Sequence, residues 1–130
     1  MDVAEYLSEH GVKPSYQRVR VLSYMLEKKN HPTVDMIFGE LSKDIPTLSR
    51  TTVYNTVNLF HQKGLVQKLG IDDEEARYDA DITVHAHFRC DKCGNIFDLP
   101  VQEPAVITGL EKMKVREIQY FIKGLCDKCK

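Results

Sequence analysis

Hydrophobic residues recur at helical spacing through the first half of the chain. The clearest run has apolar residues at positions i, i+3, i+4 and i+7, which are Val34, Ile37, Phe38 and Leu41. Polar residues that can cap a helix precede runs of this kind, and glycines that can end one follow them. We therefore expect four short helices, over residues 2–10, from Ser15, from Thr33, and from Ser49 to about Lys63.

The spacing changes after Gly64. Two short extended segments are predicted at residues 65–71 and 76–80, joined by an acidic turn at 72–75. Helices followed by a hairpin are typical of a winged helix-turn-helix, and the alternative is a generic small helical domain with a β-ribbon. The polar outer face of the fourth helix favours the first interpretation. That face consists of Arg50, Thr51, Tyr54, Asn55 and Asn58.

The second half alternates between extended and helical patterns. Strands are predicted at residues 88–91 and 96–99, a helix at 103–113 despite Gly109, and a strand at 115–123. The expected fold is therefore α+β. An N-terminal winged helix-turn-helix domain over residues 1–80 is followed by a small α/β domain over residues 81–130.

Composition adds little to this picture. The 130 residues are 42% hydrophobic and 28% charged, which is ordinary for a globular protein. The net charge of −1 does not indicate a nucleic-acid binder. Residues 1–70 carry nine Lys/Arg against seven Asp/Glu (+2), and residues 71–130 nine against twelve (−3). This mild asymmetry allows a DNA-facing first half. Two domains this small have thin cores, which a structural metal and a dimer interface would support.

The chain lacks the patterns of membrane insertion and export. Its apolar runs are far shorter than the roughly 20 residues that span a bilayer. The start, Met1–Glu5, is too acidic for a signal peptide. We expect a cytoplasmic protein with no membrane partner. In the cytoplasm cysteine thiols stay reduced and are free to bind metal. The alternative is an exported domain with two disulfides.

All four cysteines fall into two Cys-x-x-Cys pairs, Cys90 with Cys93 and Cys126 with Cys129. Two such pairs can complete a tetrahedral Zn²⁺ site, with Zn–S distances of about 2.3 Å. Because 32 residues separate Cys93 from Cys126, the ion would fasten the end of the chain to the strand pair. A closed site of this kind is structural, and we expect one zinc per chain.

A second group of metal-ligand residue types surrounds the first cysteine pair. His85 and His87 are two residues apart, so on a strand both side chains face the same way. Asp79 and Asp98 lie near them in sequence, and His31 precedes Pro32 at the start of the third helix. Nitrogen and carboxylate ligands together suit Fe²⁺, Mn²⁺ or Zn²⁺, and five or six of them suit the first two better.

The fourth helix carries the predicted DNA-contact residues Arg50, Thr51, Tyr54 and Asn55, of which the last two can contact bases. Asn55 suits adenine, and Tyr54 can contact a thymine methyl group or a phosphate. Lys13 and Arg18 are the better candidates for contacts with the DNA backbone. The acidic turn at 72–75 is expected to be solvated and to repel phosphate.

These features together resemble the ferric uptake regulator family of metal-dependent repressors over nearly the whole chain. The segments that carry the resemblance are Tyr16–Arg18, His31–Thr33, Ser49–Tyr54, Gly64–Val66, Ala76–Asp79, His85–His87, Cys90–Gly94, and the final Cys126 and Cys129. The resemblance implies a winged helix that binds DNA and a C-terminal dimerisation domain. It also implies a regulatory metal held by His31, Asp79, His85, His87 and Asp98.

Within the family, this chain looks like the peroxide-responsive branch. Aspartates stand at both carboxylate positions, where iron sensors of the family tend to carry glutamates, and Asn55 directly follows Tyr54. In that branch, bound Fe²⁺ reacts with hydrogen peroxide and a ligand histidine is oxidised, so the repressor releases DNA. The positions that match are His31 and His85.

One departure from the family pattern changes the expected metal count. Many members have a third site that uses an acidic residue between the two histidines and a further histidine in a late strand. Here Ala86 stands between them, and residues 115–123 contain no histidine. We therefore expect two metals per chain.

The leading hypothesis is a homodimeric, metal-dependent repressor that binds a palindromic operator and senses peroxide through Fe²⁺ or Mn²⁺. Within the family, the alternative is an iron, manganese or zinc uptake regulator without peroxide chemistry. A small metalloenzyme would need a general base and a substrate pocket, and no motif supplies the base. A redox-active Cys-x-x-Cys protein would hold reducible disulfides instead of tightly bound zinc. We expect neither an enzyme nor a small-molecule substrate.

Overall fold

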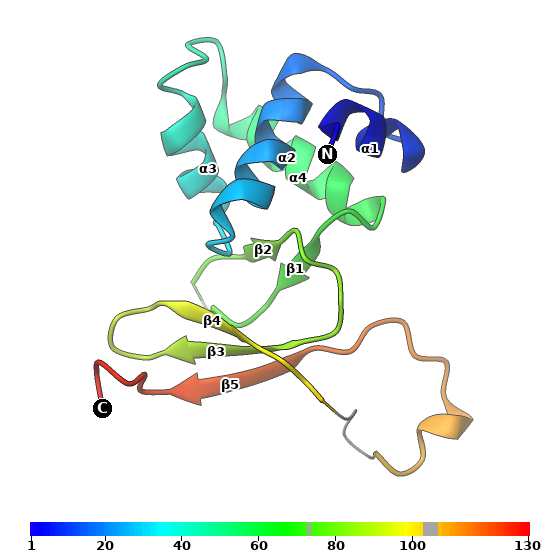
Figure 1. The fold of residues 1–130 in the computed structure, drawn as a ribbon, viewed down its shortest axis with the longest axis vertical. Helices are drawn as coiled ribbons and strands as arrows, with labels where there is room; N and C mark the ends of the chain where they lie inside the picture. The colour runs from blue at the N-terminus through cyan, green and yellow to red at the C-terminus, as the bar shows by residue number, and fades with distance from the viewer. Residues whose placement is uncertain (73, 103–106) are drawn as a thin grey trace. The chain divides into compact units, whose positions relative to one another are not determined.

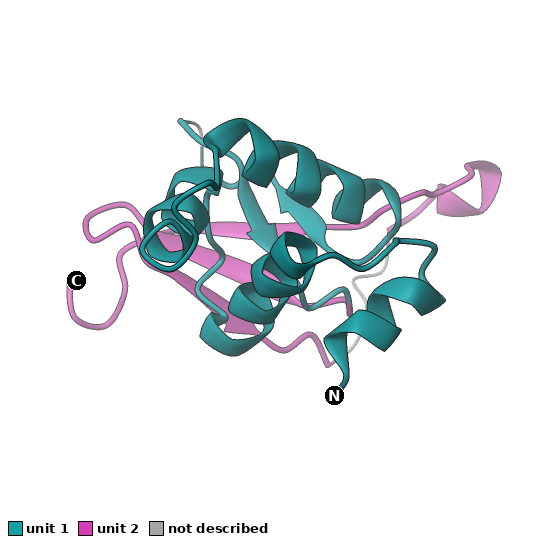
Figure 2. Ribbon diagram, turned by 90° about the horizontal axis from the view of Figure 1, so that it is seen from above, with its two compact units in different colours: residues 1–82 teal, residues 83–130 magenta. Residues whose placement is uncertain are grey.

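The structure is a computed structural model that describes residues 1–72, 74–102 and 107–130. The chain divides into two compact units, residues 1–82 and 83–130 (Figure 2). The first unit contains the helices and a hairpin (Figure 1). Its elements are α1 (Val3–Glu9), α2 (Tyr16–Lys28), α3 (Val34–Leu41), α4 (Arg50–Gln62), β1 (Gln67–Leu69) and β2 (Arg77–Asp79).

Each of the four helices begins at a capped residue. The side chains of Ser15 and Ser49 accept the backbone N–H three residues further on, at 3.2 and 3.0 Å. Asp2 and Thr33 do the same at the starts of α1 and α3. Gly64 follows α4 with a φ of 77°, the left-handed conformation that ends many helices. The predicted helices and their caps are thus confirmed.

The helices enclose one hydrophobic core. The predicted inward positions Ile37, Val53, Val57 and Phe60 are fully buried. Leu7 of α1 and Val21 of α2 join them in the same cluster. The outer face of α4 is left for other contacts, as its polar composition predicted, and Tyr54 on that face is 51% exposed.

The hairpin is shorter than the sequence predicted. β1 and β2 pair antiparallel with Lys68 opposite Tyr78. Tyr78 is buried in the core cluster. The acidic turn is not simply solvated, because Asp72 Oδ2 lies 3.5 Å from Arg77 Nη1 and the Asp72 side chain is only 13% exposed. Asp73 lies outside the described residues.

The second unit is built on a three-stranded sheet in the order β4-β3-β5. Its strands are β3 (Ala86–Cys90), β4 (Ile96–Leu99) and β5 (Tyr120–Gly124), and a 3₁₀ helix, η1, spans Leu110–Lys112. β4 runs antiparallel to β3, whereas β5 runs parallel to it. This topology brings the end of the chain beside the first cysteine pair.

Two predictions for the second unit need correction. Residues 103–106 of the predicted helix at 103–113 lie outside the described residues, and only Leu110–Lys112 of the remainder is helical. Gly109, with a φ of 98°, interrupts any regular α-helix there. The predicted strand at 115–123 begins only at Tyr120, because its partner β3 begins at Ala86, the residue opposite Tyr120.

The helices give no indication of a membrane span. None of those in the described residues combines the length and the apolar composition needed to cross a bilayer.

Candidate metal centres and DNA-contact surface

The four cysteines meet at one end of the second unit's sheet. Cys90 is the last residue of β3, and a tight turn follows, in which the Gly94 N–H donates to the Cys90 carbonyl at 2.9 Å. A matching turn joins Cys126 to Cys129, where the N–H of Cys129 donates to the carbonyl of Cys126 at 3.0 Å. Parallel pairing of β3 with β5 places both turns side by side, with Cys90 opposite Gly124.

The sulfur positions fit a tetrahedral ion. All four Sγ atoms lie within 4.8 Å of one another, and those of Cys93 and Cys126 are 3.9 Å apart. Four sulfurs at about 2.3 Å from a tetrahedral Zn²⁺ would lie ~3.8 Å from each other. The cluster therefore has the ligand type, number and spacing of a structural zinc site.

Hydrogen bonds prepare one of these thiols for metal binding. The backbone N–H groups of Cys93 and Cys126 each lie 3.5 Å from Cys90 Sγ. These donors, that of Cys93 first, lower the pKa of Cys90 to about 6. In contrast, a hydrogen bond with the Cys126 side chain raises the pKa of Cys129 to about 12. At neutral pH these shifts favour a thiolate at Cys90 and a protonated thiol at Cys129, whose proton a bound metal would displace.

The first unit brings together two of the predicted regulatory ligands. His31 precedes α3, and Asp79 ends β2. The His31 Nε2 and Asp79 Oδ2 atoms are 3.5 Å apart, and both residues are buried. The other Asp79 oxygen accepts the N–H of Asp81 at 2.8 Å, which fixes the carboxylate.

The second unit brings together the other three. Asp98 stands opposite His87 in the β3–β4 pairing, and Asp98 Oδ1 lies 3.3 Å from His87 Nε2 and 3.1 Å from His85 Nε2. Donors held about 2.1 Å from one ion at right angles would be ~3.0 Å apart. His85 Nδ1 is 2.8 Å from the Thr83 carbonyl. If Nδ1 carries the proton, Nε2 is the nitrogen that can bind a metal.

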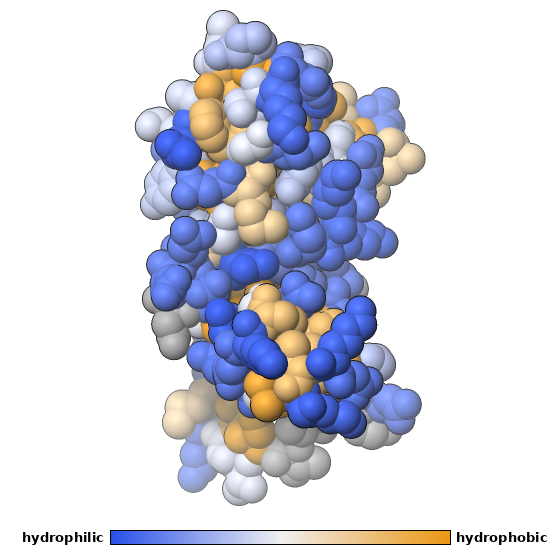
Figure 3. Space-filling view, turned by 90° about the vertical axis from the view of Figure 1, so that its left-hand side faces the viewer, coloured by the Kyte–Doolittle hydropathy of each residue, from blue (hydrophilic) through white to orange (hydrophobic). Residues whose placement is uncertain are grey.

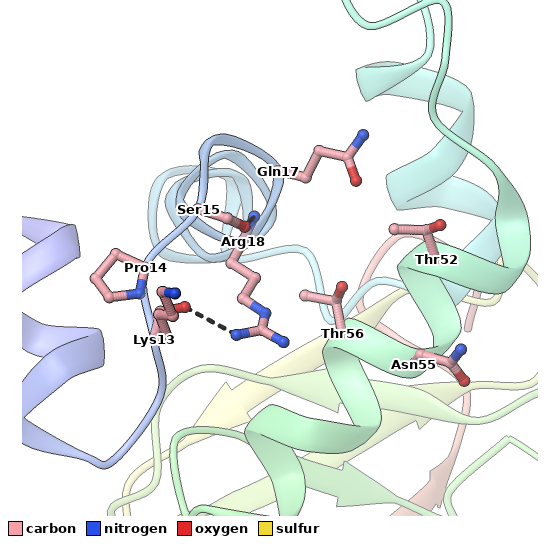
Figure 4. Close-up of a pocket in the computed structure, with 8 residues that line it drawn as sticks. All are labelled: Lys13, Pro14, Ser15, Gln17, Arg18, Thr52, Asn55 and Thr56. Carbon is pink, nitrogen blue, oxygen red and sulfur yellow. Dashed lines mark hydrogen bonds between the residues drawn. The ribbon is translucent and has the colours of Figure 1, made fainter.

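A polar hollow of about 470 Å³ lies between the start of α2 and the outer face of α4 (Figure 4). Lys13, Arg18 and Asn55, three of the predicted DNA-contact residues, line it together. Arg18 Nη1 donates to the Lys13 carbonyl at 2.8 Å and so ties the loop before α2 to the helix. Sequence reasoning missed Gln17, Thr52 and Thr56, which complete the polar wall.

Two other predicted DNA-contact residues are placed differently. Arg50 Nε donates to Asp35 at 2.8 Å, and its guanidinium lies over the Phe38 ring at 4.9 Å. Tyr54 projects from α4 beside a second hollow that Thr33, Ala76 and Tyr78 also line. Arg50 is thus already paired within the first unit, whereas Tyr54 is open to a partner.

The residues from 9 to 122 match the sequence profile of the ferric uptake regulator family. The chain belongs to this family. It is 34% identical over 135 residues to the peroxide operon regulator of Bacillus subtilis (strain 168), covering 98% of this chain and 91% of that protein.

Solved structures of the family share the fold. The Campylobacter jejuni peroxide stress regulator is 28% identical with a TM-score of 0.72, covering 99% of this chain and 100% of that one. The Helicobacter pylori ferric uptake regulator, described as having three functional metal-binding sites, has a TM-score of 0.72 at 19% identity, covering 96% of this chain and 87% of that one. The predicted α+β fold is confirmed. The predicted cofactors, a structural zinc and a regulatory metal, are supported by this membership and by the cysteine and histidine–aspartate groups.

Proposed function

We propose that the chain is a metal-dependent DNA-binding transcriptional repressor that senses peroxide through a regulatory Fe²⁺ or Mn²⁺ site. The observation that carries the proposal is the set of aspartate-only carboxylates, Asp79 and Asp98, each beside the imidazole nitrogen of a histidine. The similarity to the Bacillus subtilis peroxide operon regulator supports the same branch of the family.

The proposed ligands of the regulatory metal are His31, Asp79, His85, His87 and Asp98. The first two belong to residues 1–80, the proposed DNA-binding domain, and the other three to residues 81–130, the proposed dimerisation domain. A single ion bound by both sets would hold the two domains at one angle. In a homodimer, that angle sets the distance between two α4 helices, which must reach half-sites of a palindromic operator roughly 34 Å apart.

Peroxide would act through the same ligands. A bound Fe²⁺ would activate hydrogen peroxide beside the histidines, with peroxide as the two-electron oxidant: one of its oxygen atoms would be transferred to an imidazole carbon and the other would leave as water. His31 and His85 are the residues that we expect to gain an oxygen atom. An oxidised imidazole is a poorer ligand, so the ion would no longer hold the two domains at one angle. The two α4 helices of a dimer would then lose the spacing that operator binding requires.

The zinc proposal assigns Cys90, Cys93, Cys126 and Cys129 as the structural site, with one ion per chain. With Ala86 between the histidines and no histidine in residues 115–123, we propose two metals per chain, against the three sites described for the Helicobacter pylori relative.

The decisive experiment is peptide mass spectrometry on zinc-replete protein loaded with Fe²⁺ without oxygen and then given one equivalent of hydrogen peroxide. We expect one added oxygen on the peptides containing His31 or His85, and none after loading with Mn²⁺. Unmodified peptides despite bound Fe²⁺ would instead indicate a metal-uptake regulator with the same fold.

A DNA-binding assay tests the ligand assignment. Asp79→Ala and His87→Ala should each abolish metal-stimulated operator binding in a gel shift. Removing one ligand weakens binding of the ion, and DNA binding is coupled to metal binding. His10→Ala, a histidine outside both groups, serves as the matched control. Normal metal-stimulated binding by the two ligand variants would show that the regulatory site is wrongly assigned.

A further inference from the structure

We propose that Arg77 is a positioning residue for the regulatory metal, which it serves by holding His31 in its ligand conformation. The inference rests on the proposed regulatory site and concerns residues of the first unit alone. Arg77 lies on β2, two residues before Asp79. It is not a metal ligand, since a guanidinium has donors and no acceptor.

The Arg77 side chain forms hydrogen bonds with the loop between α2 and α3. Its Nε donates to the carbonyl of His31, and one Nη lies 3.4 Å from the carbonyl of Asn30. The other Nη is 3.5 Å from Asp72 Oδ2. The side chain is 14% exposed. One planar group thus joins two successive carbonyls of the loop to the far end of the hairpin.

The loop that Arg77 holds has an unfavourable backbone conformation. Lys29 and His31 both have a φ of 50°, and they are the positive-φ residues other than glycine in the described chain. Side chains with a Cβ are disfavoured in this left-handed region, so surrounding contacts must maintain it. A second contact helps, because the backbone N–H of Tyr78 donates to the Pro32 carbonyl at 3.0 Å.

The consequence for the metal ligands follows from the strand. Arg77 and Asp79 are two residues apart on β2, so their side chains emerge on the same face. Arg77 fixes the backbone of His31, and Asp79 faces the ring of His31 at 3.5 Å. β2 therefore fixes the backbone of His31 through Arg77, and it also carries Asp79, whose carboxylate faces the His31 ring.

Arg77 does not act by attracting the metal electrostatically, because a cation near a divalent metal site repels the metal. Asp72 lies against the guanidinium and offsets this charge. The useful property is the rigid fork of donors, which a lysine of equal charge does not have.

The test measures Mn²⁺ affinity of the zinc-replete, full-length protein by electron paramagnetic resonance. Arg77→Lys keeps the charge and removes the fork, and we expect Mn²⁺ binding to weaken roughly 10- to 100-fold, the usual effect of losing a residue that orients a ligand. Arg20→Lys is the matched control, because Arg20 also pairs with an aspartate, Asp44, at 3.0 Å in the same unit. It should bind Mn²⁺ like the wild type.

Two further measurements separate positioning from a general structural defect. Hydrogen exchange of the Tyr78 amide in the metal-free Arg77→Lys protein should be faster, while the thermal midpoint and zinc content stay near wild-type values. Lys29→Gly, which relieves one left-handed residue, should restore part of the Mn²⁺ affinity lost in Arg77→Lys.

Each outcome is informative. Wild-type Mn²⁺ affinity in Arg77→Lys overturns the proposal. If Arg77→Lys loses zinc or its fold as well as Mn²⁺ binding, Asp72→Asn is the second test, and normal Mn²⁺ binding by that variant also overturns the proposal. If Arg77→Lys does not fold, Asp72→Asn alone decides, with a several-fold loss expected. His31→Ala identifies the other failure: if it keeps full Mn²⁺ affinity, the proposed regulatory site itself is wrong.

Discussion

At the scale of the residue, Cys90 is set apart from the other cysteines by the two backbone N–H groups that lie 3.5 Å from its sulfur. These donors favour the thiolate, so the pKa of Cys90 is lowered to about 6 from an ordinary 9.0. The thiolate's contribution to stability is therefore complete above pH 9 and is lost as the pH falls through about 6.

The corresponding prediction concerns the reduced, metal-free protein. Absorbance at 240 nm should rise in a first step near pH 6, as the Cys90 thiolate forms. Cys90→Ser should lack this step, whereas Cys93→Ser should keep a low-pH step. A titration in which no thiolate forms below pH 8 would show that the N–H donors do not act in this way.

Arg77 illustrates what sequence reasoning could not provide at this scale. The cysteine site could be predicted because Cys-x-x-Cys spacing alone brings two thiols to one ion. The histidine and aspartate ligands came from the family resemblance. The contact from Arg77 to the His31 carbonyl joins positions 46 residues apart and uses a backbone acceptor that every residue has. No local pattern marks such a pair.

At the scale of the element, the helices were predictable because their signals are local. The caps of α2 and α4 act on an N–H only three residues away. The strand at β5 was predicted to begin too early because a strand can begin only where its partner begins, and that partner, β3, lies 34 residues earlier in the chain. The predicted 103–113 helix failed in its described part for a related reason, since Gly109 has a positive φ that apolar spacing does not reveal.

Ser49 gives a test of the local signal. Ser49→Ala removes the oxygen that accepts the Thr52 N–H at 3.0 Å, and should lower the free energy of unfolding by about 1 kcal/mol. Ser49→Asp, which retains a capping oxygen, should stay close to the wild type. Urea denaturation measures both. Equal loss in the two variants would mean that the hydroxyl acts through some contact other than the cap.

At the scale of the whole molecule, the two units differ in how their stability arises. The buried hydrophobic residues of the described chain lie mainly in the first unit, and those of the second are Ala86 and Cys90. We expect zinc to supply most of the second unit's stability. A strong chelator should therefore produce a separate, low-temperature transition in circular dichroism, with the helical transition retained. A single transition at the zinc-bound temperature would contradict this.

The second unit also exposes apolar side chains that a second copy of the chain would cover. On the sheet face that carries Phe88, and beside it, the exposed members are Phe97, Leu99, Ile122 and Leu125. A hydrophobic area bordered by polar residues is visible over this unit (Figure 3). Several of these side chains line a hollow of about 650 Å³ beside the cysteines. Contiguous apolar surface of this kind marks an interaction site.

The prediction is that Ile122→Glu converts the proposed homodimer to a monomer, because the substitution introduces a charge that dimerisation would desolvate. Ile122 is 47% exposed, so the fold of one chain should tolerate the change. Light scattering coupled to size exclusion measures the mass. Lys43→Glu, at an exposed position of the first unit outside this hollow, is the control. A dimeric Ile122→Glu protein would place the interface elsewhere.

From the parallel pairing of β3 with β5 we expect a definite order of folding within the second unit. β3 and β4 form a hairpin over neighbouring residues, whereas β5 can join only after the chain between Leu99 and Tyr120 has closed a long loop. Cys90 and Cys93 are thus together early, and Cys126 and Cys129 arrive late. Zinc already bound by Cys90 and Cys93 would speed the pairing of β5 with β3 by binding Cys126 and Cys129. Metal supply would then govern the rate at which new protein becomes functional as well as its final stability.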